Sequence, residues 1–453
     1  MTKLPALCIA SLFLLQAPFA AAQTPLEQRI DAALAPMFKP NWPGATVIVT
    51  RNGKPVFRKA YGLASVQDNT PMQPEMQLRM GSITKQFTAV GILQLAEQGK
   101  LSVKDDIRKY LPDFPDKGKT ITIEHLLHHT SGIPNYTSLK AFRGLLGENV
   151  SVPQVYASFK DEALEFATGE RHSYSNSGYF LLGMVIEKLA GAKYQDYVAQ
   201  NIFDPLGMKD TAYEGSERSD KRRIKGHRLS GKDIVPVSDI DVDIAYAAGA
   251  LVTTVDDMAR WDAAVSSGKL LKAATWSQAF TSCSLPQDAP CNYGYGWNIG
   301  TLAGHKMIHH GGSIPGFTAQ ALRLPDDKVF VAVLTNGNGG AVNTPVIAYK
   351  TAAIAIGLPF PEFKAVAVAP EALDSFVGTY VSADKTKRVF KREGDKLTMQ
   401  RDGRDAATLM AHGPDRFFMD GSLASLEFQR GADGKVQSLL VRQPGVDETA
   451  QRQ

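Results

Sequence analysis

Two pairs of predicted β-strands near opposite ends of one long segment most limit the folds open to this chain. The first, "GATVIVTRNGKPVFRKAYG" (residues 44–62), is two β-rich runs around Asn52-Gly53, the dipeptide favoured in two-residue hairpin turns. The second, "GFTAQALRLPDDKVFVAVLTNG" (residues 316–337), gives two strands around a turn at Pro325-Asp326-Asp327, and its Val-rich second strand should lie deep in a sheet. The pattern predicts an antiparallel sheet built from distant parts of the chain.

Two helices are predicted between these strand pairs. "SITKQFTAVGILQLAEQG" (residues 82–99) and "SGYFLLGMVIEKLAG" (residues 177–191) each end at a glycine, the usual residue after a helix C-terminus. Each run is apolar nearly all round, so both helices should be buried. Strands at both ends and helices between them favour an α+β fold, with an antiparallel sheet flanked by helices and an inserted helical lobe.

The end of the chain has a different pattern. After "FPEFK" (residues 360–364) comes a small-residue, proline-containing stretch, and then short strand-like pieces such as "GTYVS" separated by Gly and Asp turns. Residues 370–453 are therefore predicted to form a small all-β, barrel-like accessory domain, and residues 23–364 the main domain.

Composition narrows the classes of partner. The 453 residues are 44% hydrophobic and 21% charged, which is typical of globular domains and not of disordered chains. The net charge is only +4, and the basic residues are scattered along the chain. We therefore expect a small-molecule or peptide substrate and no nucleic-acid partner. The oligomeric state stays open.

The first 22 residues resemble a secretory signal. Lys3 precedes an apolar stretch through Leu15, and the small residues Ala20, Ala21 and Ala22 precede Gln23. A membrane anchor is the alternative, but the stretch is shorter than the roughly 20 apolar residues that a span needs. We expect a secreted or periplasmic protein with no stable membrane insertion after signal cleavage.

Removal of such a signal, which contains Cys8, leaves two cysteines. Cys283 and Cys291 flank a proline-containing loop, and in an exported chain this arrangement suggests one disulfide. Two buried thiols are the alternative, and a metal site would need more ligands.

"RMGSITKQFTAV" (residues 79–90) places Ser82 and Lys85 three positions apart at the start of a predicted helix. Residues i and i+3 share a helix face, so the lysine amine can reach the serine hydroxyl. An isolated pair of this kind is more often a capping serine and an exposed lysine.

Two further stretches strengthen the catalytic interpretation. "TGERHSYSNSGYFLLG" places Tyr174 and Asn176 two apart before a buried helix, so both side chains can point into one cavity, although a turn and a cap would look the same. "MIHHGGSIPGF" places His310 before Gly311-Gly312 at a predicted strand end, where missing side chains allow a close approach to the backbone. A glycine turn with a surface histidine is the alternative there.

In this order and spacing, the three motifs resemble the penicillin-recognising serine hydrolases: class C β-lactamases, D,D-peptidases of the same fold, and their esterase and D-aminopeptidase relatives. Segments such as "HHTSGIP", "IFDPLGM", "AAGALVTTVDDMARW" and "YGYGW" extend the resemblance over most of residues 27–358. It implies that residues 23–364 are a serine hydrolase domain with neither metal nor organic cofactor.

The resemblance also implies roles for individual residues. Ser82 would be the nucleophile and Lys85 its base or electrostatic partner. Tyr174 and Asn176 match the Y-x-N motif, with Asn176 holding a substrate carbonyl or amide group. His310 and Gly312 belong to the third motif. The backbone N–H groups of Ser82 and Ser313 would form the oxyanion hole.

Elementary chemistry sets a requirement for the proposed pair. Lysine and tyrosine, with ordinary pKa values near about 10, are mostly protonated at neutral pH, and a serine nucleophile needs a base within reach. Burial would lower the pKa of Lys85, and a nearby ammonium would lower that of Tyr174. The two could share one proton as a unit, and the sequence leaves open which of them accepts the serine proton.

One departure from the motifs bears on the substrate. Class C β-lactamases carry lysine where His310 stands, and histidine is mostly neutral at pH 7. Some D,D-peptidases of the fold carry histidine followed by threonine, where this chain has Gly311. The resemblance therefore favours hydrolysis of an ester or amide, including D-amino-acid-containing peptides, over β-lactam hydrolysis. A non-catalytic penicillin- or peptidoglycan-binding module is a further alternative.

Weaker candidates favour structural roles. The spacing of His125, His128 and His129 could chelate zinc on a helix, but no matching carboxylate or cysteine set accompanies them. Glu170 beside Arg171 suggests a surface pair or a loop anchor. Asp256-Asp257 suggests the first turn of a helix, where acidic side chains are favourable.

Overall fold

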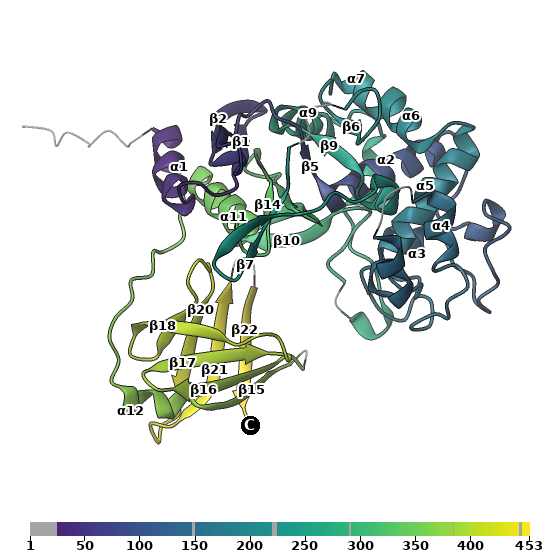
Figure 1. Cartoon of the computed structure of the whole chain (residues 1–453). Coiled ribbons are helices and arrows are strands. Elements are labelled where there is room, and N and C mark those ends of the chain that lie inside the picture. Colours follow the sequence, from purple (N-terminus) through teal and green to yellow (C-terminus); the bar gives the residue numbers. More distant parts are fainter. Residues whose placement is uncertain (1–24, 147–149, 220–223, 290, 384, 444–445) are drawn as a thin grey trace, which may run out of the picture.

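A six-stranded antiparallel sheet forms the centre of the larger part of the chain (Figure 1). The computed structural model describes residues 25–146, 150–219, 224–289, 291–383, 385–443 and 446–453. In spatial order the strands are β10 (Asn298–Leu302), β11 (His305–Ile314), β12 (Phe317–Leu324), β13 (Val329–Thr335), β1 (Ala45–Arg51) and β2 (Lys54–Tyr61). In β1, Val47 lies opposite Lys59 on one side and Val333 on the other. The first and last parts of this domain therefore meet in the middle of one sheet.

Both predicted strand pairs are confirmed. The β1–β2 turn has Asn52 at φ 53° and Gly53 at φ 71°, the pair of positive values that a type I′ hairpin turn requires. All seven residues of β13 are buried, because strands flank it on both sides and helices cover both faces of the sheet.

Alternation along the central strands divides the interior into two cores. Val47 and Val49 face one core and Ile48 faces the other, as the two-residue period of a strand dictates. Helices α1 (Leu26–Leu34) and α11 (Thr344–Ala355) cover the first face, and α2 (Thr84–Glu97) and α9 (Val255–Ser266) pack in the second core.

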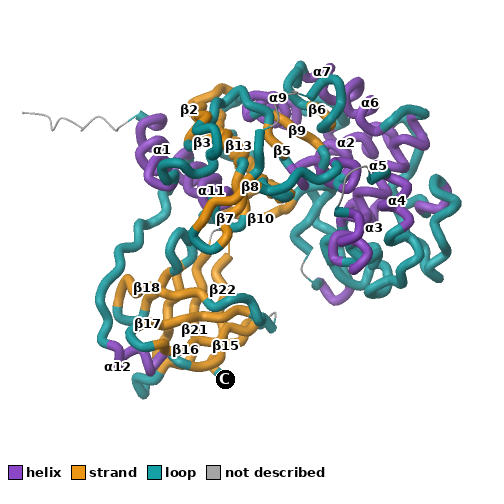
Figure 2. Tube along the Cα trace, viewed as in Figure 1, coloured by secondary structure: helices purple, strands orange, loops and turns teal. Residues whose placement is uncertain are grey.

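A helical lobe is inserted between the strand blocks, as predicted (Figure 2). Its helices are α3 (Ile123–Leu127), α4 (Val152–Ala157), α5 (Asn176–Ala190), α6 (Tyr194–Val198), α7 (Asp204–Leu206) and α8 (Tyr246–Gly249), and α10 (Ala273–Ala279) follows α9. Gly99 and Gly191, both at positive φ, follow the ends of α2 and α5. The predicted burial of both helices is confirmed.

Three small sheets connect the lobe to the central sheet. They consist of β3 (Leu63–Ser65) with β4 (Thr70–Pro71); β5 (Leu78–Arg79), β9 (Leu251–Thr253) and β6 (Ala212–Tyr213); and β14 (Gly337–Asn338), β7 (His227–Ser230) and β8 (Asp233–Pro236). The second of these sheets leads directly into the turn that carries Ser82.

The C-terminal residues form a closed eight-stranded barrel. After α12 (Pro370–Leu373) its strands are β15 (Gly378–Ser382), β16 (Lys387–Glu393), β17 (Lys396–Arg401), β18 (Ala407–Gly413), β19 (Arg416–Phe418), β20 (Ser425–Arg430), β21 (Val436–Gln443) and β22 (Val446–Arg452). Aromatic side chains, among them Phe376, Tyr380 and Phe428, fill its interior. The predicted fold class, α+β with a helical lobe and a small all-β C-terminal part, is confirmed.

The N-terminal signal predicted for residues 1–22 lies outside the described residues. Within the part of the chain that the structure describes, no helix is both long enough and apolar enough to cross a membrane.

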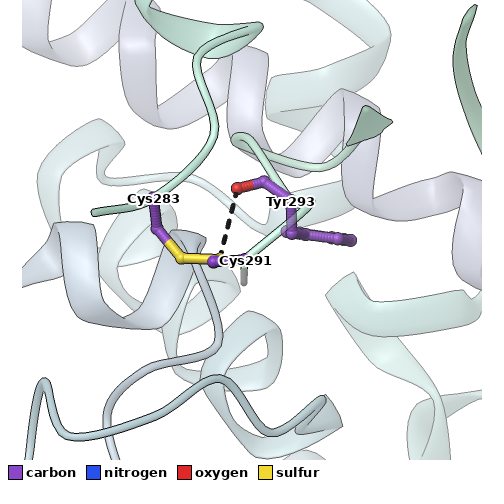
Figure 3. The surroundings of a disulfide bond; sticks show 3 residues. All are labelled: Cys283, Cys291 and Tyr293. Carbon is purple, nitrogen blue, oxygen red and sulfur yellow. Dashed lines mark hydrogen bonds between the residues drawn. A yellow bond between two sulfur atoms is a disulfide. The ribbon is translucent and has the colours of Figure 1, made fainter. Parts of the chain in front are cut away.

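The predicted disulfide between Cys283 and Cys291 is present (Figure 3). Its Cα atoms are 5.6 Å apart, and the bridge closes a short loop before β10. The Cys291 sulfur lies 3.9 Å from the carbonyl oxygen of Tyr293, which also accepts a hydrogen bond from the Cys283 N–H. The bridge therefore anchors the segment that carries Tyr293.

Replacing both cysteines by serine should lower the free energy of unfolding by about 2–3 kcal/mol, because the unfolded chain regains the freedom that a short closed loop removes. All four tryptophans precede residue 300, so tryptophan fluorescence during denaturation reports on the larger domain and not on the barrel. A reductant should shift the wild-type midpoint to that of the double variant and leave the variant unchanged. Equal midpoints without reductant would contradict the prediction.

Candidate active site

Ser82 lies in a 3₁₀ turn (Gly81–Ile83) between β5 and α2. Gly81 has φ 52°, which a residue with a side chain would adopt at a cost, and this conformation brings the chain sharply from the strand into the helix. Ser82 remains half-buried although its neighbours Gly81 and Ile83 are buried. The hydroxyl therefore stands at the N-terminal end of a buried helix.

Lys85 is fully buried in the first turn of α2. Its Nζ lies 3.2 Å from Ser82 Oγ, 2.8 Å from Asn176 Oδ1 and 2.9 Å from the carbonyl oxygen of Ala248. Burial holds the pKa of Lys85 well below its usual range. The predicted lowering of the pKa of Lys85 is borne out, and the predicted contact with Ser82 is present.

Asn176 is held in place from both ends of its amide. Its Oδ1 accepts the Lys85 amine, and its Nδ2 donates to Asn135 Oδ1 (3.2 Å) and Thr137 Oγ1 (3.4 Å). Asn135 Oδ1 also accepts the backbone N–H of Asn176. Asn135 and Thr137 were not predicted as site residues, although both directly follow the "HHTSGIP" segment.

Tyr174 lies beside this group with 37% of its surface exposed. Its ring centroid is 4.9 Å from Lys85 Nζ and 4.3 Å from the ring of His129. Desolvation by these neighbours raises the pKa of the Tyr174 phenol, and an interaction with Ser82 lowers it by less. The prediction that an ammonium would lower this pKa is wrong, because Lys85 is itself desolvated and loses its charge.

His310 is buried and already has two protein partners. Its Nε2 lies 2.8 Å from the Tyr293 hydroxyl and its Nδ1 lies 2.6 Å from the Gly311 carbonyl oxygen. A carbonyl can only accept, so we assign the ring proton to Nδ1 and let Nε2 accept from Tyr293. Burial lowers the pKa of His310 to about 3, so the ring is neutral at pH 7.

The prediction that His310 and its glycines end a strand is wrong. They lie inside β11, which continues through Ile314, because strand pairing with β12 tolerates the two glycines. The alternative of a surface histidine is also wrong, since His310 is only 3% exposed.

Gly312 allows β11 to pack directly on the turn that carries Ser82. A Cβ atom there would lie 1.9 Å from the carbonyl oxygen of Met80 and 3.2 Å from the backbone nitrogen of Ser82. A Cβ on Gly81 would similarly lie 2.9 Å from the backbone nitrogen of Ser313. The missing side chains therefore bring the backbone N–H groups predicted to form the oxyanion hole to one place, at which Ser82 and Ser313 line the same cavity.

A cavity of about 490 Å³ opens beside Ser82. Such a volume is in the usual range for small-molecule sites. Its lining residues are Gly81, Ser82, Tyr136, Thr137, Phe142, Leu146, Asn176, Arg228, Val237, Ile240, Ile244, Ala245, Ala248, Gly249, Ser313, Ile314, Pro315 and Asn338. The lining does not include Tyr174, His310 or Gly312. If these residues affect a substrate in the cavity, they act through the neighbouring residues that they contact.

The three histidines of the sequence motif take separate structural positions. His125 Nδ1 accepts the Thr122 N–H at the start of α3, and the rings of His128 and His129 pack against tyrosines. Across the described residues, no group of three or more His, Cys, Asp or Glu side chains is placed to hold a metal ion.

The remaining weak candidates are structural. Glu170 accepts the backbone N–H of Ala167 and so anchors its loop, while Arg171 lies over the ring of Phe166. Asp256 and Asp257 lie in the first turn of α9, as predicted, with Thr254 as the capping residue.

Comparison with known proteins agrees with this geometry. Residues 26–356 match the family described as Beta-lactamase, and residues 362–453 match a Domain of unknown function (DUF3471). Penicillin-binding protein 4* of Bacillus subtilis (strain 168) is 27% identical over 435 residues, covering 90% of this chain and 94% of that protein.

Solved structures give the same result. The octameric penicillin-binding protein homologue from Pyrococcus abyssi has a TM-score of 0.66 and 27% identity, covering 94% of this chain and 99% of that one. A D-stereospecific amidohydrolase from Streptomyces sp. has a TM-score of 0.59 and 26% identity, covering 69% of this chain and 94% of that one.

The chain belongs to the β-lactamase family. The family match covers most of the chain and includes all three motifs. The resemblance to penicillin-recognising serine hydrolases drawn from the sequence is confirmed, and catalysis through an acyl-enzyme is general in this family.

Gly312→Ala should lower the rate at which a fluorophosphonate labels Ser82 by about 100-fold, because a misplacement of about 1 Å in such a site costs about that much. The new Cβ would collide with the rigid Met80 carbonyl. Gly311→Ala is the matched comparison: its Cβ would meet only the flexible Gln320 side chain, at 3.0 Å, and the loss should be several times smaller. Equal losses in the two folded variants would contradict the prediction.

Proposed function

We propose that this chain is an exported serine hydrolase that cleaves an ester or an amide through an acyl-enzyme on Ser82. The observation that carries the proposal is the set of three contacts made by the buried Lys85 amine. Export is supported by the signal-like residues 1–22 and by the disulfide, since disulfides persist in oxidising compartments.

The Lys85 contacts favour this residue as the base. A neutral amine has two N–H groups and one lone pair. The Asn176 Oδ1 and the Ala248 carbonyl oxygen can only accept, and they are the two shorter contacts, so they take both N–H groups. The lone pair is then directed at Ser82 Oγ, 3.2 Å away, and can accept its proton.

The reaction follows from this arrangement. As Ser82 Oγ bonds to the substrate carbonyl carbon, its proton moves to Lys85 Nζ, and the oxyanion is stabilised by the backbone N–H groups of Ser82 and Ser313. Collapse of the tetrahedral intermediate breaks the bond to the leaving group, which receives the proton from Lys85 Nζ. Water then cleaves the acyl-enzyme by the same steps in reverse order.

The substrate class is supported by two observations of different kinds. Similarity to a D-stereospecific amidohydrolase supports an amide containing a D-amino acid. The neutral, hydrogen-bonded His310 supplies no fixed positive charge where class C β-lactamases carry lysine, which argues against β-lactam binding in the manner of those enzymes. Hydrolysis or trapping of a β-lactam is the second candidate, favoured by the similarity to penicillin-binding protein 4*.

Intact-mass spectrometry after exposure to p-nitrophenyl acetate, a penicillin and a D-Ala-D-Ala peptide tests the proposal. We expect an adduct or turnover with at least one reagent, and loss of more than about 1000-fold of that rate in Ser82→Ala, because removing the nucleophile leaves only residual catalysis. Ser267→Ala, at the exposed end of α9, is the control and should behave as wild type. Adducts that persist in Ser82→Ala, or none with any reagent, would overturn the proposal.

The pH dependence of acylation tests the role of Lys85. A general base works only when deprotonated, so the rate should rise as pH increases through the lowered pKa of Lys85 and then level off. This rise should occur well below the usual lysine range near about 10.4. Lys85→Met should abolish the rise together with most of the rate, measured by stopped-flow release of p-nitrophenol. A rise that persists in a folded Lys85→Met protein would assign the base elsewhere.

A further inference from the structure

Among the described residues that line the cavity beside Ser82, Arg228 is the only one of the Lys, Arg, Asp or Glu type. No aspartate or glutamate is among the described residues that line it. Arg228 lies on β7, opposite Asn338 of β14, and that pairing holds its backbone beside the cavity wall. A substrate that fills this cavity therefore meets a fixed positive charge, with no negative one among the described lining residues.

Within the described part of the chain, Arg228 has no partner that neutralises its charge. Among the described residues, no carboxylate lies within ion-pair distance of its guanidinium, and no side chain or carbonyl bonds to it. Arg79 shows the contrast: it is buried and makes a two-point contact with Glu214 and a third with Asp239. The guanidinium of Arg228 is exposed, so its five N–H donors are available to a ligand.

Another part of the cavity wall is apolar. Phe142, Leu146, Val237, Ile240 and Ile244 contribute side chains to its wall. Leu146 is 50% exposed, which is unusual for a large apolar side chain in this molecule. A bound apolar group would cover this surface and remove it from water.

We propose that the substrate cleaved at Ser82 carries both an apolar group, packed on the Phe142–Leu146 side, and a carboxylate bound by Arg228. The planar guanidinium matches a carboxylate through two parallel hydrogen bonds. A substrate with a free ammonium near this position is disfavoured, because the described lining offers it a cation and no carboxylate. This inference rests on the proposed serine hydrolase function and narrows its substrate class.

The charge lies on the β7–β8 hairpin. His310 on β11 has both ring nitrogens engaged by Tyr293 and Gly311, so it offers no free donor to an anion. The positive charge in the cavity lining comes from Arg228 of β7.

Three p-nitrophenyl esters with one scaffold test this inference: phenylacetate, 4-carboxyphenylacetate and 4-(aminomethyl)phenylacetate. They differ only in charge, at zero, −1 and +1. In the wild type, kcat/KM should be about tenfold higher for the anionic than for the neutral ester, and lower for the cationic one, as expected for a charge-assisted contact. The anionic preference should shrink at high salt.

Arg228→Gln should reduce the anionic-to-neutral ratio of kcat/KM about tenfold, and Arg228→Lys should keep part of it, because the charge remains and the fork is lost. Lys232→Gln removes an equal charge from the exposed end of the same hairpin and should keep the wild-type ratio. Circular dichroism and thermal unfolding check that each variant folds.

The outcomes separate the two proposals. If the neutral ester is hydrolysed at Ser82 but charge has no effect, or the preference survives in Arg228→Gln, this inference is overturned and the proposed function stands. If Lys232→Gln lowers the ratio as much as Arg228→Gln, the preference reflects general charge and the assignment to Arg228 is wrong. If the wild type reacts with none of the three esters, the proposed function fails and this inference fails with it.

Discussion

The amine of Lys85 is the interaction on which the rest of the site depends. It joins α2 to α5 through Asn176 and to α8 through the Ala248 carbonyl, with Ser82 as the third contact. An ammonium without a nearby carboxylate is costly to bury, and the neutral form loses little because two acceptors satisfy its two N–H groups. Packing of the lobe on α2 thus fixes both the position and the protonation state of the Lys85 amine.

Backbone, and not side chains, forms the other half of the site. Gly81 and Gly312 leave no room for a Cβ where the Ser82 turn meets β11, and Gly296 leaves none beside the carbonyl of Lys85. The disulfide anchors the segment that carries Tyr293, and Tyr293 in turn orients His310 on β11. The strand therefore presents N–H groups to the cavity, while its histidine serves to hold the strand in place.

The sequence predicted those features that depend on local spacing. Ser82 and Lys85 share a helix face, Asn52-Gly53 sets a hairpin, and the glycines after α2 and α5 end helices, so neighbours in sequence were enough. Asn135, Tyr293 and Arg228 were missed because each acts on a partner that only the folded chain brings near. The pKa of Tyr174 was predicted in the wrong direction since its shift depends on the protonation state of Lys85, which depends in turn on burial. His310 was predicted at a strand end because Gly311 and Gly312 were taken to stop the strand. In the structure β11 continues through them, and Gly312 allows it to pack against the Ser82 turn.

The groups proposed to react and most of the cavity wall lie on different segments of the chain. The groups proposed to react lie on the Ser82 turn, α2, α5 and β11, where glycine contacts and buried hydrogen bonds leave little freedom for change. The cavity wall comes instead from residues 136–146 and 228–245, which are short turns and a two-stranded hairpin. Thr137 supports Asn176 and through it the Lys85 amine, whereas none of the three contacts of that amine comes from the β7–β8 hairpin. In the proposed reaction, substitutions on the hairpin, Arg228 included, can therefore change substrate preference without loss of reactivity.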